Sequence, residues 1–259
     1  MLCAMQSFLP DTCLAAEVVP SPNHGERRGG TPNMLLLHYT GMIDGDSALR
    51  RLCAPDSEVS AHYVVFEDGR MVQCVPEVRR AWHAGEACWA GATDINSLSI
   101  GIEVVNPGHE FGYEDFPAAQ VDAIVALCGD ILARHRIHPA RVLGHSDVAP
   151  RRKRDPGEKF PWERLHRAGI GHWAPPAPIG AGAALAPGDT GPAVEAWQRA
   201  LAGYGYDLPI ISLYDRATAA ATTAFQRHFR PGRVDGIADP STRATLRTLT
   251  ATLPTLAVL

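Results

Sequence analysis

Residues 34–40 read MLLLHYT, a short apolar run that ends in polar residues, and this stretch decides the fold class. Its uninterrupted apolar part has the length of a strand. Residues 99–105, SIGIEVV, form a second strand-like run, and residues 141–145, RVLGH, form a third. These three runs are therefore expected to be strands of one domain.

The segments between these runs complete a mixed α/β pattern. Residues 62–75, HYVVFEDGRMVQCV, contain two strand-like halves around Asp68-Gly69, a dipeptide that favours tight hairpin turns. Pro117 opens a stretch with apolar residues at helical spacing, and a short helix is expected near residues 161–168. We expect an α/β domain in which a mixed sheet is flanked by helices.

A change in composition divides the chain. Residues 174–187 read APPAPIGAGAALAP, a charge-free and proline-rich segment typical of a linker. We expect one domain over residues 1–173 and a small three-helix domain over residues 188–259, with helices starting at Asp189-Thr190, at Thr218 and at Ser241. Few contacts should cross such a linker, so each unit should fold alone.

The overall composition limits the partners and the location. The 259 residues contain 24 Lys and Arg against 28 Asp and Glu, a net charge of -4, which argues against nucleic acid or an anionic membrane as a partner. No apolar run approaches the roughly 20 residues of a transmembrane segment. The N-terminal residues make a poor secretory signal, and the six cysteines contain no CxxC pair. These features favour the cytoplasm, with the periplasm as the alternative.

Three residues have the chemistry of metal ligands. His38 and His145 each end a predicted strand, and Asp155 follows His145 by ten residues. Zinc in catalytic sites typically takes three protein ligands from His, Asp, Glu or Cys and leaves a further position for water. Two histidines at strand ends and a carboxylate on a nearby loop would meet that need. The spacing alone also allows each histidine to be an ordinary hydrogen-bonded residue.

The segments around these residues resemble the AmpD/AmiD-type zinc N-acetylmuramoyl-L-alanine amidases. They read LLLHYT, SAHYVV, RAWHAG, NSLSIGIEVVN and GHSDVAPRRKRDPGEKFPW, in this order. The resemblance implies the fold shared by peptidoglycan-recognition proteins and phage lysozyme-like amidases, and zinc bound by His38, His145 and Asp155. It also implies hydrolysis of the amide between N-acetylmuramic acid, or its 1,6-anhydro form, and L-alanine of the stem peptide.

The same resemblance suggests two catalytic side chains. Strand alternation places Glu103 on the face opposite Ile100 and Ile102, where the residues alone favour a solvated carboxylate. The family pattern instead implies that Glu103 is the proton shuttle. Lys153 lies two residues before Asp155 in a basic run, and an extended loop would point both side chains to the same side. It matches the family's catalytic lysine, which would stabilise an oxyanion.

Further residues are candidates for substrate binding. Arg80 and Arg152 resemble family residues that hold stem-peptide carboxylates, for which the guanidinium fork is suited. Trp82 packs in the core or stacks on a sugar, and His83 resembles a cleft residue. Asn96 is either a loop cap or a substrate contact, and His62 is expected to be a structural histidine.

The C-terminal unit resembles a three-helix peptidoglycan-binding module, with ISLYD at residues 211–215 in place of the usual glycine-rich turn. The expected partners are peptidoglycan fragments or the sacculus. Two alternatives stay open: a non-catalytic muropeptide receptor on the same scaffold, and an exported or phage-type amidase that lyses intact wall. Retention of all three zinc ligands argues against the receptor.

Overall fold

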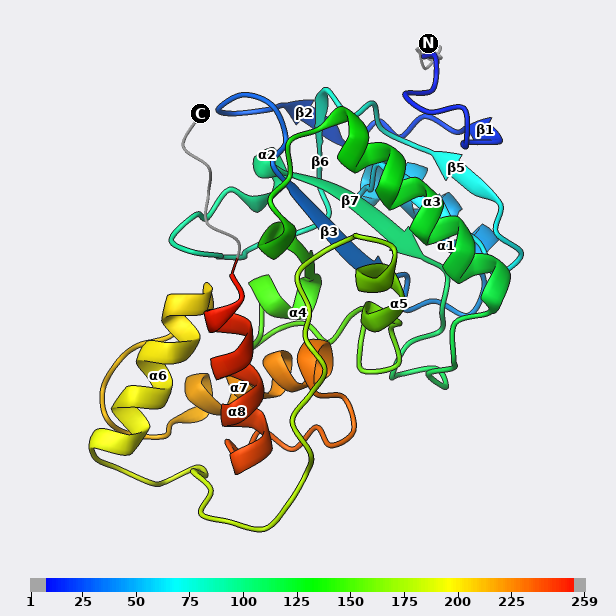
Figure 1. Ribbon diagram of the computed structural model, residues 1–259. Helices are drawn as coiled ribbons and strands as arrows, with labels where there is room; N and C mark the ends of the chain where they lie inside the picture. The colour runs from blue at the N-terminus through cyan, green and yellow to red at the C-terminus, as the bar shows by residue number, and fades with distance from the viewer. Residues whose placement is uncertain (1–7, 254–259) are drawn as a thin grey trace.

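The computed structural model describes residues 8–253, and the larger of its two sheets has six strands (Figure 1). The strands have the spatial order β1-β5-β4-β7-β3-β8. Their bounds are β1 Glu17–Val18, β3 Met34–Tyr39, β4 Tyr63–Val65, β5 Met71–Gln73, β7 Ser99–Val104 and β8 Val142–Gly144. A separate two-stranded ribbon pairs β2 (His24–Glu26) with β6 (Arg79–Ala81).

The centre of the sheet is parallel, and this arrangement positions the site. β3 lies between β7 and β8 and is parallel to both, with His38 opposite Glu103 in the β3–β7 register. β4 is parallel to β7 and antiparallel to β5. Because parallel strands end at the same edge, the carboxyl ends of β3, β7 and β8 meet there, the usual place for ligands in such sheets.

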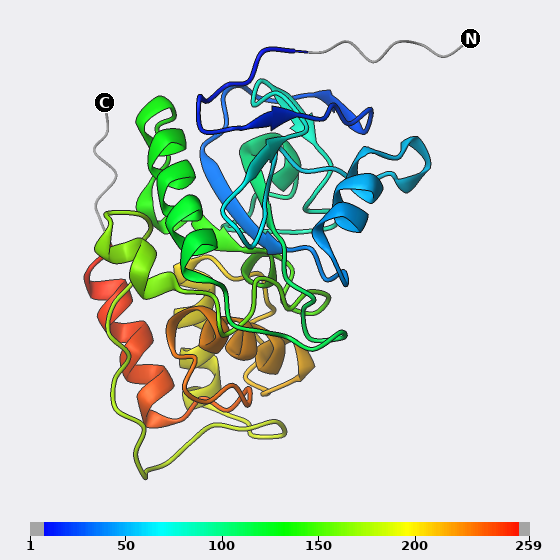
Figure 2. The same cartoon turned by 90° about the vertical axis from the view of Figure 1, so that its right-hand side faces the viewer.

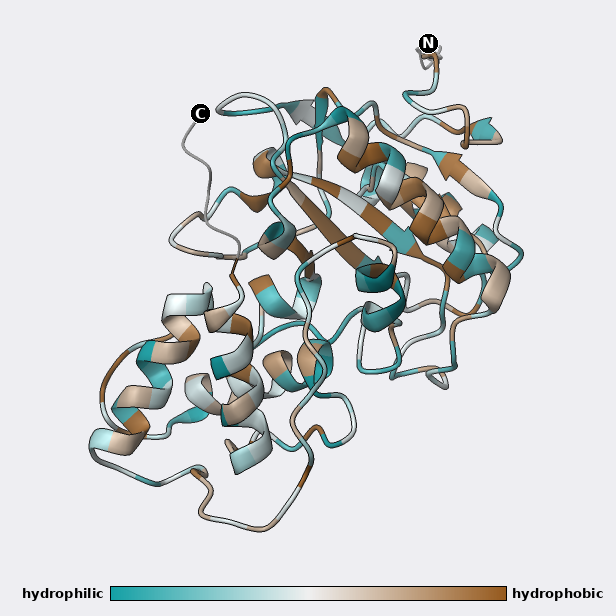
Figure 3. Cartoon of the chain, viewed as in Figure 1, coloured by the Kyte–Doolittle hydropathy of each residue, from teal (hydrophilic) through white to brown (hydrophobic). Residues whose placement is uncertain are grey.

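Apolar residues on both faces of β3 explain the unbroken run at residues 34–37. Leu35 and Leu37 pack with the long helix α3 (Ala118–Arg134), whereas Met34 and Leu36 belong to a cluster on the opposite face. The helix α1 (Gly45–Cys53) also covers that opposite face, through Leu52, so α1 and α3 lie on opposite sides of the sheet (Figure 2). The strands accordingly carry strongly hydrophobic residues in Figure 3.

The structure confirms the strands and helices expected in the first domain. The hairpin β4–β5 turns at Gly69, whose φ of 88° favours glycine, and α3 begins directly after Pro117. The short helix near residue 161 is α5 (Trp162–Arg167). Three helices of this domain were not predicted, α1, α2 (Ile95–Leu98) and α4 (His145–Val148), and α4 begins where the third strand was expected to end.

The second domain contains three helices, α6 (Pro192–Tyr204), α7 (Arg216–Phe229) and α8 (Pro240–Ala251). Their starts differ from the prediction because other residues cap them. Gly191 precedes α6, and the side chains of Asp215 and Asp239 accept hydrogen bonds from the backbone amides at the starts of α7 and α8. The altered turn places Ser212 at a φ of 60°, a conformation that glycine adopts without strain.

The two domains share one apolar core, which differs from the expected independence of the units. Met34 and Leu36 of β3 belong to the same cluster as Trp197 and Phe225 of the helical domain. Trp89 packs edge-on against Tyr206, with ring centroids 5.0 Å apart. The linker composition predicted few contacts between the domains, but the side chains on either side of it form a packed interface.

The linker itself also contacts the helical domain. Ala177 donates its amide to the Thr245 hydroxyl over 3.0 Å and accepts a hydrogen bond from Ser241, and Leu185 forms an antiparallel bridge with Ala238. Over residues 8–253 no helix is both long and apolar enough to cross a bilayer. The domain boundaries at residues 173 and 188 remain our proposal.

Candidate active site

Three side chains from the carboxyl edge of the sheet form the candidate metal centre. His38 is the penultimate residue of β3, and His145 follows β8 directly as the first residue of α4. Asp155 is on the following loop, whose backbone is tied to α4 because the Ser146 amide donates to the Asp155 carbonyl oxygen over 2.8 Å. All three side chains are buried. The sheet topology therefore brings together residues that are 107 and 117 positions apart in sequence.

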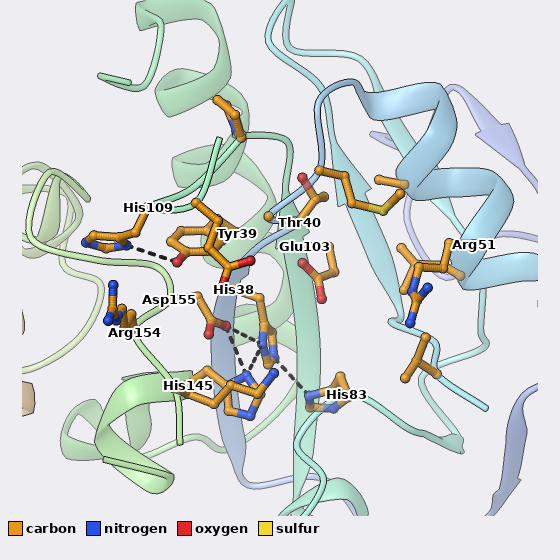
Figure 4. Close-up of a pocket in the computed structure, with 18 of the residues that line it drawn as sticks. His38, Tyr39, Thr40, Arg51, His83, Glu103, His109, His145, Arg154 and Asp155 are labelled. Atoms are coloured by element: carbon orange, nitrogen blue, oxygen red, sulfur yellow. Dashed lines mark hydrogen bonds and ion pairs between the residues drawn. The ribbon is translucent and has the colours of Figure 1, made fainter. Parts of the chain in front are cut away.

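The polar atoms of these side chains face a single point (Figure 4). The Nδ1 atoms of His38 and His145 are 2.9 Å apart, and Oδ2 of Asp155 lies 3.0 Å and 2.9 Å from them. Burial on its own would raise the pKa of Asp155, but the contacts with His145 and His38 lower it well below the usual range. Asp155 is therefore a carboxylate.

Hydrogen bonds on the outer nitrogens determine where the imidazole protons are. Nε2 of His145 is 2.9 Å from the carbonyl oxygen of Ala84, which only accepts, so Nε2 holds the proton. Nε2 of His38 is 3.0 Å from Nδ1 of His83. Burial lowers the pKa of His38 to about 4, so this ring is neutral. It therefore holds one proton, on either Nδ1 or Nε2.

The direction of the His38–His83 bond follows from the next contact. Ser99 donates its hydroxyl proton to the Ile95 carbonyl oxygen over 2.6 Å, so its oxygen accepts from Nε2 of His83 over 3.3 Å. Nδ1 of His83 is thus an acceptor and His38 donates to it. Gly101 makes this possible, because a Cβ at that position would lie 2.5 Å from the His83 ring.

These proton positions leave two unprotonated nitrogens and a carboxylate pointing at one another. Such a buried set of acceptors repels itself unless a cation lies between them. Two imidazole nitrogens and one carboxylate oxygen are also the donor types found in catalytic zinc sites. The residues His38, His145 and Asp155 therefore fit a divalent metal ion.

A cleft of about 500 Å³ opens over this centre and contains both predicted catalytic side chains. Glu103 lines it from β7, and within the described residues its Oε2 is buried without a hydrogen-bond partner. Burial, supported by the negative charge of Asp155, raises the pKa of Glu103 well above the usual range, while Lys153 opposes this effect. Lys153 also lines the cleft. The carboxyl group is thus near the metal centre with an unsatisfied oxygen.

The predicted substrate-binding residues divide into two groups. Trp82, His83 and Arg152 line the cleft, although His83 already uses both ring nitrogens and Arg152 donates to backbone carbonyl oxygens at residues 84 and 86. Arg80 and Asn96 are not in the lining. Arg80 forms an ion pair with Asp94 at 2.9 Å, and the Asn96 side chain accepts from the amides of residues 83 and 84.

His62 has the structural role expected for it. It is fully buried, and its Nδ1 accepts from the Gly101 amide over 2.9 Å. Its Nε2 contacts the Arg79 carbonyl oxygen and the Arg27 guanidinium. Burial, together with the charge of Arg27, lowers the pKa of His62 to about 3. The ring is therefore neutral and outside the cleft.

Sequence reasoning missed two arginines that line the cleft. Arg51 comes from α1 and Arg154 precedes the ligand Asp155, and they lie on opposite sides of the metal centre in Figure 4. Neither guanidinium has an ion pair within residues 8–253, and both side chains are exposed. The signal for Arg154 was its adjacency to Asp155, whereas Arg51 lies on a helix that the sequence analysis did not identify.

Comparisons with known proteins agree with this geometry. Residues 28–158 match the family described as N-acetylmuramoyl-L-alanine amidase, and residues 190–246 match the family described as putative peptidoglycan binding domain. The chain is 40% identical to the N-acetylmuramoyl-L-alanine amidase AmiD of Escherichia coli over 82% of this chain and 79% of AmiD. It is 34% identical to the 1,6-anhydro-N-acetylmuramyl-L-alanine amidase AmpD of Enterobacter cloacae, over 58% of this chain and 88% of AmpD.

Solved structures give the same picture for both domains. The complex of Escherichia coli AmiD with anhydro-N-acetylmuramic acid-L-Ala-D-gamma-Glu-L-Lys superposes with a TM-score of 0.71 at 36% identity, covering 87% of this chain and 92% of that one. AmpDh3 of Pseudomonas aeruginosa in complex with anhydromuramic pentapeptide gives a TM-score of 0.70 at 32% identity, covering 88% and 94%. The mixed sheet flanked by helices is therefore the architecture of these amidases.

Proposed function

This chain belongs to the N-acetylmuramoyl-L-alanine amidase family, and from this premise we propose that it uses zinc to release stem peptides from muropeptides. The bond cleaved is the amide between N-acetylmuramic acid, in its 1,6-anhydro form in the soluble substrate, and L-alanine. The observation that carries the metal assignment is the convergence of two unprotonated imidazole nitrogens and a carboxylate at His38, His145 and Asp155.

The predicted catalytic and binding residues that line the cleft have distinct roles in this proposal. Zinc at the three ligands would polarise the scissile carbonyl and lower the pKa of bound water from about 15.7 to about 7. Glu103, with its unpaired oxygen, takes the proton from the attacking water and passes a proton to the leaving amine. Lys153 provides a positive charge for the oxygen that becomes anionic in the transition state. We expect Trp82 and Arg152, which line the cleft, to contact substrate.

The alternative of a non-catalytic receptor is less well supported. A receptor needs the cleft but gains nothing from a buried set of metal donors, and here the complete set is present with fixed proton positions. The close relatives are amidases. Catalysis is therefore the better account of the site.

For the natural substrate we favour soluble 1,6-anhydro-muropeptides, since the two solved complexes that superpose on this chain contain anhydro-muropeptides. The match of residues 190–246 to a putative peptidoglycan binding domain supports intact wall as the second candidate. For location we keep the cytoplasm as the proposal, with the periplasm as the alternative. The five cysteines in the described residues are free, which suits a reducing compartment, and Cys3 lies outside those residues.

A direct assay tests the function and separates the two substrates. The purified protein is expected to release L-alanine-initiated peptides from anhydro-N-acetylmuramyl peptides, measured as new free amino groups and by mass spectrometry. Purified sacculi are digested in parallel at matched amounts of stem peptide. A higher rate on the soluble fragment supports the recycling reaction, and a higher rate on sacculi supports wall lysis. Failure to cleave either substrate in the presence of zinc would contradict the amidase assignment.

Substitution of Arg51 is expected to weaken binding of the acidic stem peptide. A charged hydrogen bond contributes about 1.5–3 kcal/mol, and 1.4 kcal/mol is about tenfold in affinity, so Arg51→Gln should raise KM by about tenfold or more with little change in kcat. Arg50→Gln is the matched control, because Arg50 is on the same helix, bonds to Ser47 and does not line the cleft. If amidation of the stem-peptide carboxylates leaves the effect of Arg51→Gln unchanged, Arg51 does not bind them.

A further inference from the structure

The helix that carries the metal ligand His145 has little stability of its own. α4 contains four residues, and the Ala149 amide closes its single turn on the His145 carbonyl oxygen over 3.0 Å. Isolated helices shorter than about 12–15 residues are marginal in water. The orientation of α4, and hence of the His145 ring, therefore depends on what holds the helix from outside.

Asp147, two residues after His145, provides this external attachment. Its carboxylate is fully buried and accepts the Gly144 amide over 2.8 Å, which caps the start of α4. The other two donors come from the helical domain. The Tyr206 hydroxyl donates to Oδ1 and Nδ1 of His228 donates to Oδ2, both over 2.7 Å. We call the contact of Asp147, Tyr206 and His228 the α4 clasp.

Aromatic packing holds His228 in the orientation that the clasp needs. Its ring stacks on Trp162 with centroids 3.7 Å apart and on Phe229 with centroids 3.8 Å apart. Trp162 begins α5 and also packs close to Gly144 at the start of α4. The ring of His228 is thus fixed between the two domains and aims Nδ1 at Asp147.

The neighbouring residue of α7 reaches a second part of the site. Arg227 is 3.4 Å from the Glu158 carboxylate, which contacts Nε2 of His109 at 3.2 Å. Nδ1 of His109 is 2.9 Å from the Tyr39 hydroxyl, and Tyr39 and His109 both line the cleft. Of two consecutive residues of α7, His228 therefore contacts the ligand helix directly, and Arg227 is linked to the cleft lining through Glu158.

We propose that the helical domain helps to orient the metal ligand His145. Tyr206 and His228 are positioning residues that act through Asp147. This inference rests on the proposed function, because it assumes that His145 is a metal ligand. The domain would then do more than bind peptidoglycan. Partners that orient metal ligands from outside typically change metal affinity by about 10–100-fold when they are removed.

Metal affinity of single variants in the full-length protein tests the proposal. Tyr206→Phe removes one donor to Asp147, and His228→Phe removes the other while it keeps an aromatic ring between Trp162 and Phe229. Each is expected to raise the zinc dissociation constant by about tenfold or more, measured by competition with a chromophoric chelator. The absorption spectrum of the cobalt-substituted protein should shift as well, because the His145 ring loses its fixed orientation.

Tyr214→Phe is the matched control. Tyr214 is as buried as Tyr206, but its hydroxyl donates to the Gly236 carbonyl oxygen and contacts Thr222, entirely within the helical domain. The Tyr214→Phe substitution should lower the thermal unfolding midpoint and leave the zinc dissociation constant within about twofold of the parent value. If Tyr206→Phe binds zinc and gives the cobalt spectrum as Tyr214→Phe does, the positioning role is wrong.

The outcomes also separate this inference from the amidase proposal. If the parent protein itself binds no zinc, the metal assignment fails. If the parent binds zinc and His38→Ala abolishes binding, but the clasp variants behave like the control, only the clasp fails. Should His228→Phe not fold, the milder Tyr206→Phe decides the question.

Discussion

Replacement of any one metal ligand is expected to abolish amidase activity and metal binding together. His38→Ala, His145→Ala and Asp155→Ala each remove one of three donors from a buried set whose atoms lie within 4.8 Å of one another. Metal ions supply several kcal/mol of transition-state stabilisation, which corresponds to a rate loss of about 10³-fold or more. The measurements are kcat on an anhydro-muropeptide and metal content after dialysis.

Two comparisons make this prediction decisive. Chelation of the parent protein should abolish turnover and added zinc should restore it, whereas zinc should not restore the alanine variants. His166→Ala is the control, because His166 is an exposed histidine on α5 that lies outside the cleft lining. Full activity of metal-free parent protein would show that the three residues form an ordinary hydrogen-bonded cluster.

The strands that carry the site could be predicted because their signal is local. The run at residues 34–37 is apolar throughout and its length favours a strand, and the structure buries all four of its side chains. The helix α1 was missed even though Asp44 caps it through the Ser47 amide, since its short amphipathic pattern lies between two stronger strand signals. The local sequence pattern therefore predicted the strands that position the metal centre but not the helix that contributes Arg51.

Long-range contacts explain the rest of what the sequence did not predict. The metal donors could be proposed from a family resemblance, but the proton positions depend on Ala84 and Ser99, whose contacts exist only in the folded chain. The proline-rich linker indicated independent domains. The structure instead joins them through Trp89 and Tyr206, and through the buried carboxylate of Asp147. The composition of the linker does not predict contacts between residues that lie outside it.

The arrangement also indicates why a buried carboxylate in the cleft is expected to be catalytic rather than structural. The structural carboxylate of Asp147 has both oxygens satisfied, by three donors. Oε2 of Glu103 is buried without a partner in the described residues, and the raised pKa of Glu103 reflects burial and the nearby charge of Asp155. Groups with perturbed pKa values in a cleft are frequently functional, and a bound dication would lower this one again.

Glu103→Gln is therefore expected to remove catalysis while metal binding remains. Glutamine keeps the shape of the side chain but takes up no proton from water, so kcat should fall by about 10²–10⁴-fold, the usual contribution of general acid–base catalysis. Zinc content should match the parent, because His38, His145 and Asp155 are untouched. Glu67→Gln, an exposed carboxylate beside the β4–β5 turn, should behave as the parent does. Parent-like turnover of Glu103→Gln would show that Glu103 is not the proton shuttle, whereas joint loss of zinc and turnover would show that it supports the metal centre instead.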